Sequence, residues 1–99
     1  RTYVNGIPFA SKREANRYTL LLLLERGGYL TNLELQPVYP LEVNGKVVGK
    51  YVADFRYLDC TEKGKAEWIV EDCKGVPTPV YKLKKRMMDA QYGITIRET

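Results

Sequence analysis

The chain has 99 residues, of which 44% are hydrophobic and 28% are charged, and this length is enough for one compact domain but too short for two. We therefore expect residues 1–99 to form a single domain, and the composition excludes a disordered or collagen-like chain. Sixteen Lys and Arg residues against twelve Asp and Glu residues give a net charge of +4. This excess favours a polyanionic partner, although a solvated helix face also explains a basic run.

The chain has two cysteines, Cys60 and Cys73, and no histidine. A disulfide scaffold and a zinc site therefore lack the residues they need, and a serine or cysteine hydrolase would lack its usual general base. The longest apolar run, Leu20 to Leu24, is far shorter than the about 20 residues that cross a bilayer. We expect a soluble protein of a reducing intracellular compartment, with no membrane partner. Because the sequence begins at Arg1 rather than at methionine, we also expect it to be the ordered part of a slightly longer chain.

The first predicted element in chain order is a tight turn at Asn5-Gly6, between residues 2–4 and 7–9. Ser11 to Glu14 has the pattern of a capping box. Apolar residues follow at helical spacing until Gly27-Gly28, which stops the helix. The sequence therefore predicts a short hairpin followed by a helix.

Apolar residues alternate between Leu30 and Val43 around two prolines, a pattern typical of an interrupted or edge strand. Asn44-Gly45 then predicts a hairpin turn. Residues 47–58 have the β-branched and aromatic content of a second strand. We therefore expect these two strands to pair as a hairpin.

Residues 67–74 return as a third predicted strand after a polar connection. Thr78 is a favourable helix cap and Pro79 a favourable first-turn residue. They open a basic helix that continues through about Gln91, and residues 94–96 form a short last strand.

The predicted order is therefore αβββαβ, with a mixed central sheet flanked by helices. The first three strands should pair antiparallel, as connections of this kind allow. The last two strands flank a helix and should be parallel, joined by a right-handed crossover. The fold class is mixed α and β.

Acidic and basic residues lie within the second predicted strand and near the end of the third. Because side chains alternate along a strand, Asp54 shares a face with Arg56, and Asp72 shares a face with Lys74. If the two strands are neighbours, two carboxylates and an ammonium converge, and burying like charges is costly unless a cation bridges them. Mg²⁺ is commonly held by one or two carboxylates together with substrate phosphate. The sequence thus predicts a metal site at which Lys74 orients or deprotonates the attacking water.

These acidic residues also have structural interpretations. Glu14 fits a capping box that needs no metal. Asp72 could form an ion pair with Lys74 or Arg56. A one-residue bulge would exchange Asp72 for Glu71 as the second acid.

The basic helix offers further candidates. Three apolar residues make its predicted inward stripe: Val80, Leu83 and Met87. Three basic residues on other faces are predicted to contact phosphate: Lys82, Lys85 and Arg86. Tyr81 could stack on a nucleotide or pack in the core. Gln36, on the first strand, could reach the site or be an ordinary polar residue of an edge strand.

Two motifs, Ala53-Asp54-Phe55 and Glu71-Asp72-Cys73-Lys74-Gly75, resemble the metal site of the PD-(D/E)xK nuclease superfamily. The resemblance covers nearly the whole chain, from Val4-Asn5-Gly6 to Tyr81-Lys82-Leu83-Lys84. Within this superfamily, the chain is similar to a group of small phage-encoded nucleases that are compared with Holliday junction resolvases and with the nuclease subunit of certain transposases. The resemblance implies a restriction-endonuclease-like core.

Residue roles follow from the resemblance by matching position. It implies that Glu14, Asp54 and Asp72 are ligands of Mg²⁺ or Mn²⁺ and that Lys74 is the catalytic lysine. The chain departs from the pattern in two ways, with Ala53 before the first acid instead of proline, and with aspartate as the second acid instead of the commoner glutamate. These changes alter the reach of the acids without removing their capacity to bind metal.

The expected function is that of a Mg²⁺-dependent endodeoxyribonuclease acting on branched recombination or replication intermediates, in the cytoplasm of a phage host. Its partners would be DNA, a second copy of the chain in a homodimer that supplies two active sites, and a replication or recombination protein. Two alternatives stay open: a nucleic-acid-binding module without catalysis, and a nuclease subunit active only within a transposition or replication complex.

Overall fold

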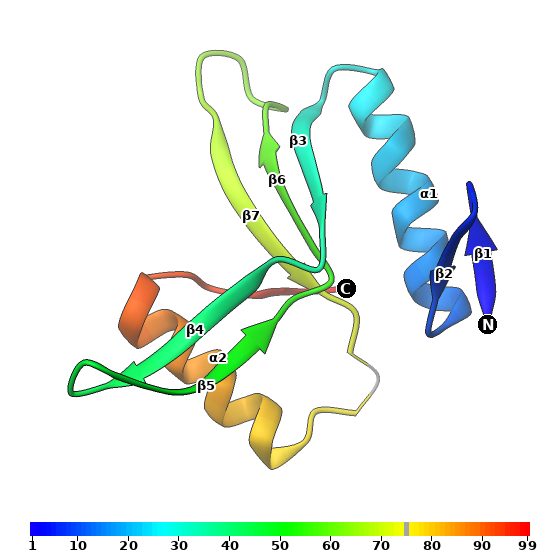
Figure 1. Cartoon of the computed structure of the whole chain (residues 1–99). Helices are drawn as coiled ribbons and strands as arrows, with labels where there is room; N and C mark the ends of the chain where they lie inside the picture. Colours follow the sequence, from blue (N-terminus) through cyan, green and yellow to red (C-terminus); the bar gives the residue numbers. More distant parts are fainter. Residues whose placement is uncertain (75) are drawn as a thin grey trace. The chain divides into compact units, whose positions relative to one another are not determined.

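The computed structural model describes residues 1–74 and 76–99, and these contain two helices and eight strands in the order β1-β2-α1-β3-β4-β5-β6-β7-α2-β8 (Figure 1). The chain divides into two compact units. The first unit comprises residues 1–33 and 57–68, and the second comprises the described residues of 34–56 and 69–99. The predicted class, mixed α and β, is confirmed. The predicted order αβββαβ is incomplete, because it does not count the strands of the first hairpin and because two predicted strands, residues 30–43 and 47–58, are each divided into two.

The first unit begins with an antiparallel hairpin of β1 (Thr2–Val4) and β2 (Ile7–Phe9), in which Val4 is opposite Ile7. Its turn residues Asn5 and Gly6 have φ values of 50° and 77°. Asparagine and glycine tolerate this left-handed conformation better than other residues do. The hairpin predicted from Asn5-Gly6 is therefore confirmed.

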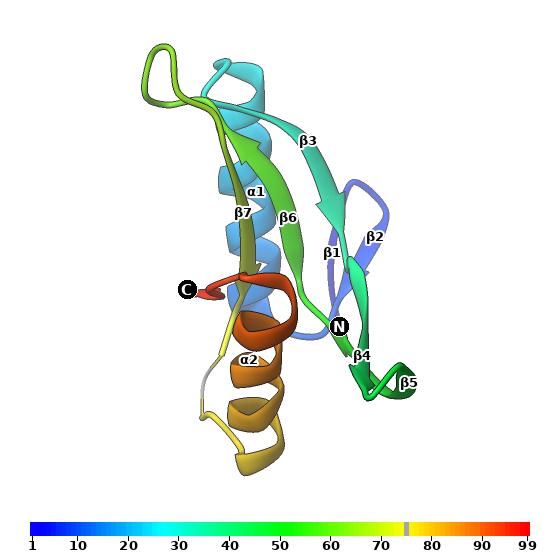
Figure 2. The same cartoon turned by 90° about the vertical axis from the view of Figure 1, so that its left-hand side faces the viewer.

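Helix α1 (Lys12–Arg26) follows the hairpin, which lies beside it in both views (Figure 1, Figure 2). The helix begins where the Ser11 hydroxyl accepts a hydrogen bond from the Glu14 backbone N–H at 3.1 Å, which satisfies one donor of the first turn. It ends at Gly27, as predicted. The rings of Phe9 and Tyr18 have centroids 5.0 Å apart and pack the hairpin against the helix.

One four-stranded sheet has the strand order β3-β6-β7-β8. Its strands are β3 (Leu30–Leu35), β6 (Phe55–Asp59), β7 (Glu67–Asp72) and β8 (Arg97–Glu98). β7 and β8 are parallel, with Asp72 opposite Glu98, which confirms the predicted parallel pairing. The predicted position of the last strand, residues 94–96, is wrong, because pairing with β7 starts at Arg97. The predicted end of the third strand at Gly75 lies outside the described residues.

A separate two-stranded sheet is the hairpin of β4 (Val38–Val43) and β5 (Lys46–Val52). The predicted turn at Asn44-Gly45 is confirmed, with φ values of 50° and 78° at its two residues. β5 does not continue into β6 as predicted, because the chain bends at Asp54. The predicted strand of residues 30–43 is likewise two strands, β3 and β4.

The two strand interruptions are hydrogen-bonded to each other. Gln36, with φ of 51°, donates its backbone N–H to the Asp54 carbonyl at 2.9 Å, and Ala53 donates its N–H to the Pro37 carbonyl at 3.1 Å. Proline has no N–H for a ladder, and a left-handed residue does not continue a strand. The segments around Gln36 and Asp54 therefore bend opposite each other. The bend at Asp54 places this residue beside β7, where its N–H donates to the Glu71 carbonyl.

Helix α2 (Pro79–Tyr92) begins at its predicted cap and ends at its predicted glycine. The Thr78 hydroxyl accepts from the Tyr81 N–H at 3.1 Å, and Gly93 closes the helix with φ of 67°. The helix contacts β4 in the second unit and crosses it in Figure 1. Gln91 binds that strand at two points, donating to the Pro40 carbonyl at 3.1 Å and accepting from the Glu42 N–H at 3.0 Å. Neither helix, within the part of the chain that the structure describes, is long and apolar enough to cross a membrane.

The core of the second unit forms between this helix and the strands. Its buried members are Tyr39, Leu41, Tyr51, Ala53, Val70, Tyr81, Met88 and Ile96. The predicted inward stripe of the helix is wrong: Val80 and Leu83 are 63% and 55% exposed, and Met87 is only partly buried. Tyr81 and Met88, two helical turns apart, face inward instead, because adjacent positions on a helix differ by about 100° in direction.

We predict that Met88→Ala destabilises the chain by about 2–5 kcal/mol, because it leaves a cavity at a fully buried position. Leu83→Ala, at an exposed position of the same helix, should change stability by less than about 0.5 kcal/mol. Urea denaturation followed by circular dichroism measures both. Equal losses in the two variants would contradict the observed helix orientation.

Candidate functional site

Asp54 lies at the bend between β5 and β6 and is half-buried. Its backbone N–H donates to the Glu71 carbonyl at 3.1 Å, and its carbonyl accepts from Gln36. Its Oδ2 accepts a hydrogen bond from the Cys73 backbone N–H at 2.7 Å. The carboxyl group is therefore held against the end of β7 by main-chain contacts.

Asp72 is the last residue of β7, and it is 1% exposed. Its carbonyl accepts from the Thr99 N–H at 3.1 Å. The Tyr51 hydroxyl donates a hydrogen bond to its Oδ2, and the Lys74 Nζ lies 3.4 Å from the same oxygen. Strand pairing on one side and a buried tyrosine on the other thus orient this carboxyl group.

The two carboxyl groups interact unfavourably when both are ionised. The pKa of Asp72 is raised from 3.8 to about 6, chiefly by burial and further by a side-chain hydrogen bond with Asp54 and the charge of Asp54. The Tyr51 hydrogen bond and the charge of Lys74 oppose this rise in pKa. Two adjacent carboxylates share a proton or a cation more readily than they ionise together. Two hard oxygen donors in this state fit Mg²⁺, which takes one or two carboxylates and completes its shell with water and substrate phosphate.

Lys74 is oriented by a second set of contacts. Its Nζ lies 4.7 Å from the centroid of the Tyr81 ring, a favourable cation–π distance. The Tyr81 hydroxyl donates to the Glu98 Oε2 at 2.7 Å, and the Lys85 Nζ lies 3.2 Å from that oxygen. Burial and the Glu98 carboxylate raise the pKa of Tyr81, so its hydroxyl stays a donor. The hydrogen bond from Tyr81 and the contact with Lys85 lower the pKa of Glu98.

Three of the predicted site residues therefore come together in the second unit: Asp54, Asp72 and Lys74. Asp72, and not Glu71, is the acid whose carboxyl group contacts Lys74, while the Glu71 side chain is fully buried. Glu14 belongs to the first unit, where it is 9% exposed and its N–H contacts the helix cap. Its role as a metal ligand stays a prediction. Among residues 1–74 and 76–99, no three carboxyl or thiol groups are arranged to hold a metal ion.

The predicted nucleic-acid contacts have different environments on α2. Lys82 and Arg86 are exposed, and Lys85 is partly exposed beside Glu98. Tyr81 is 6% exposed and packs in the core, which favours the packing interpretation that the sequence left open. The Gln36 side chain is exposed, and this residue contacts Asp54 through its backbone N–H.

Two residues near the site carried little signal in the sequence. Tyr51 is buried, and a buried tyrosine hydroxyl usually has a polar partner, which is the only clue to its contact with Asp72. Glu98 lies on a two-residue strand whose pairing with β7 depends on contacts far apart in the chain. The sequence predicted a parallel last strand, but at residues 94–96, and so it did not point to Glu98.

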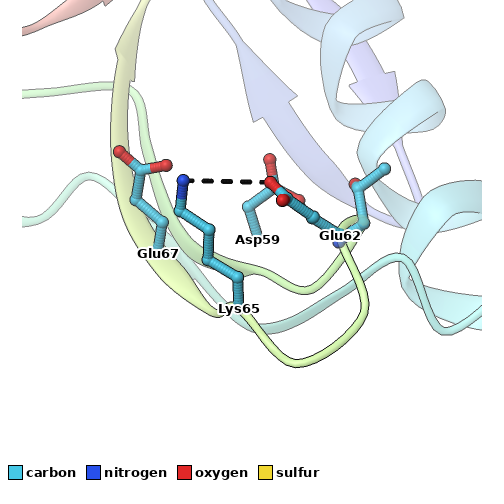
Figure 3. A pocket seen from close by; sticks show the side chains of 5 residues that line it. Asp59, Glu62, Lys65 and Glu67 are labelled. Carbon is cyan, nitrogen blue, oxygen red and sulfur yellow. Dashed lines mark hydrogen bonds and ion pairs between the residues drawn. The ribbon is translucent and has the colours of Figure 1, made fainter.

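A polar hollow lies in the first unit, lined by Asp59, Thr61, Glu62, Lys65 and Glu67 (Figure 3). The Lys65 Nζ lies 3.8 Å from the Glu62 Oε2, and Figure 3 shows its amine directed between the carboxylates. The Asp59 Oδ1 accepts from the Thr61 N–H at 2.9 Å, a local turn contact. These contacts are local ones within the connection between β6 and β7, and they account for the hollow without a ligand.

Comparison with known proteins gives one match. A family model described as "Protein of unknown function (DUF1064)" matches residues 1–98 of the chain. Neither the curated proteins nor the solved structures gave a significant match.

We predict that Asp72→Asn stabilises the metal-free chain at pH 8. The pKa of Asp72 is higher in the folded chain than in the unfolded chain, so between about pH 4 and pH 6 the folded chain keeps a proton that the unfolded chain has lost. Stability from this group is therefore present below about pH 4 and is lost as the pH rises to about 6. A difference of this size corresponds to at most roughly 3 kcal/mol, and asparagine avoids the loss.

Urea denaturation in EDTA at pH 4.5 and pH 8 measures this effect. The variant should gain more over the natural chain at pH 8 than at pH 4.5. Asp89→Asn, at an exposed position of α2, is the matched control and should change stability by less than about 0.5 kcal/mol. A loss of stability in Asp72→Asn at pH 8 would show that the ionised carboxylate is not under strain.

Proposed function

Because this chain belongs to the DUF1064 family, whose description assigns no function, we propose a function from the geometry of its own residues. We propose that it is a Mg²⁺-dependent endonuclease that hydrolyses phosphodiester bonds in DNA. The observation that carries this proposal is the interaction between the carboxyl groups of Asp54 and Asp72, together with the Lys74 Nζ 3.4 Å from the Asp72 Oδ2.

The residues divide the expected chemistry between them. Asp54 and Asp72 would hold the cation, and Tyr51 keeps the Asp72 carboxyl group oriented through its hydrogen bond. A bound Mg²⁺ supplies Lewis-acid polarisation of the phosphodiester and lowers the pKa of a bound water.

Lys74 would act on the reacting groups directly. Its side chain is 33% exposed and lies 3.4 Å from the Asp72 Oδ2, so it can donate a hydrogen bond to a water or phosphate oxygen next to that carboxylate. A positive charge in this place stabilises the negative charge that develops on phosphate in the transition state. Taking a proton from the attacking water is a second role proposed for this lysine.

The charge of the chain is consistent with a DNA substrate. The net charge is +4, and Lys82 and Arg86 are exposed on α2, where they can contact phosphates. Lys85 would contribute less, because it already pairs with Glu98.

The finer parts of the proposal rest on the resemblance to PD-(D/E)xK nucleases. They are a restriction-endonuclease-like core, Glu14 as a third ligand, Mn²⁺ as a substitute for Mg²⁺, and branched recombination or replication intermediates as substrates in the cytoplasm of a host cell. A homodimer would supply the two active sites that a junction cutter needs. A replication or recombination protein would be a further partner.

We predict that the full chain cleaves DNA with Mg²⁺ and that Asp54→Asn lowers the rate at least about a hundredfold, because it removes one charged ligand of the ion. Lys74→Gln should lower the rate without abolishing DNA binding. A panel of linear, flap and four-way DNA substrates, with Mg²⁺ or with EDTA, measures both activity and substrate preference.

Asp89→Asn is the matched control, since this exposed aspartate lies outside the site, and it should cleave at the normal rate. Unchanged cleavage by Asp54→Asn would refute the proposed site. DNA binding without cleavage of any substrate would favour a non-catalytic module. Cleavage that arises only with an added replication or transposition protein would favour a subunit of a complex.

A further inference from the structure

A hollow of about 310 Å³ lies in the second unit between β5 and the start of α2. Its size is at the lower end of ligand pockets. Three lysines from three different segments line it: Lys50 from β5, Lys74 after β7, and Lys84 from α2. A small positively charged recess is suited to a compact anion.

The charge of this hollow has one sign. Of the described residues that line it, none carries a carboxylate. Thr78 adds a hydroxyl, which accepts from the Tyr81 N–H and can still donate its own hydrogen. Three ammonium groups and one hydroxyl are donors, and phosphate oxygens are strong acceptors for such groups.

The remaining walls of the hollow are apolar. Tyr51 and Tyr81, only 3% and 6% exposed, form its inner wall with ring centroids 6.4 Å apart. Both hydroxyls are engaged, with Asp72 and Glu98 respectively. Val52 and Val80 add exposed apolar surface, at 39% and 63%. A ligand that combines a phosphate with an apolar sugar or base surface fits this lining better than a free carboxylate does.

The hollow adjoins the acidic pair of Asp54 and Asp72, because two of the residues that line it also contact Asp72. Tyr51 and Lys74 line the hollow and also contact the Asp72 carboxyl group. A group in the hollow would therefore lie next to a phosphodiester at Asp54 and Asp72. We infer that the hollow binds a second phosphate group of the same DNA strand, adjacent to the one that is cut. This inference rests on the proposed function, which supplies DNA as the ligand.

Two lysines can be removed without touching the acidic pair. The double variant Lys50→Gln/Lys84→Gln keeps most of the length of each side chain and removes two charges. Lys46→Gln is the matched control, because this exposed lysine lies on β5 outside the lining of the hollow. Circular dichroism checks that both variants fold.

The first measurement is binding of a fluorescent 12-base-pair DNA duplex by anisotropy over a range of KCl concentrations, with Ca²⁺ in place of Mg²⁺. The plot of log K against log [KCl] has a negative slope. This slope should become less steep by about one unit in the double variant, since one phosphate contact is lost. Lys46→Gln should keep the slope of the natural chain. Equal slopes in the two variants would overturn the inference.

The second measurement uses inorganic phosphate and NMR, without divalent metal and without DNA. Phosphate should shift the backbone amide signals of Lys50, Thr78 and Lys84 in the natural chain, and the double variant should lose these shifts. Phosphate that shifts none of them would also overturn the inference. If the chain binds phosphate and DNA here but never cleaves, the proposed function fails and the phosphate subsite stands. If it cleaves with an unchanged salt slope, the subsite fails and the function stands.

Discussion

The close approach of the carboxyl groups of Asp54 and Asp72 is the constraint on which the second unit depends. Burial and the neighbouring acid together raise the pKa of Asp72 to about 6, so the metal-free chain bears an unfavourable charge at neutral pH. Such a pair is destabilising unless a proton or a cation bridges it. The surrounding contacts hold the pair in place: Tyr51 donates to Asp72, and the Cys73 N–H donates to Asp54. Acidic groups that are fixed in an unfavourable arrangement and have a strongly shifted pKa are typical of functional sites.

The same constraint explains the interrupted strands. A continuous strand through Asp54 would lose the bend at which the Asp54 carbonyl meets Gln36 and its N–H meets Glu71. The left-handed φ of Gln36 and the missing N–H of Pro37 end β3 at the same level. The hairpin of β4 and β5 then packs on α2, and the buried Tyr81 of that helix lies against Lys74. The backbone breaks, the helix and the lysine are thus parts of one arrangement around the two acids.

Features set by a few neighbouring residues could be predicted from the sequence. The turns at Asn5-Gly6 and Asn44-Gly45 and the caps of both helices depend on local backbone preferences, and all are present. Features that depend on distant contacts could not be predicted. Nothing local distinguishes the stripe of Tyr81 and Met88 from that of Val80 and Leu83, because both have helical spacing. The acids and Lys74 could be proposed because charge within an apolar strand is costly, whereas the contributions of Tyr51 and Glu98 required the folded chain.

The central claim is that Asp54 and Asp72 together bind one divalent cation. Isothermal titration calorimetry with Mn²⁺ at pH 7.5 tests it most directly, because it needs neither DNA nor cleavage. We expect one site in the natural chain, loss of that site in Asp54→Asn and in Asp72→Asn, and an unchanged site in Asp89→Asn. Binding that persists in both site variants, or no binding to the natural chain at millimolar Mn²⁺, would contradict it.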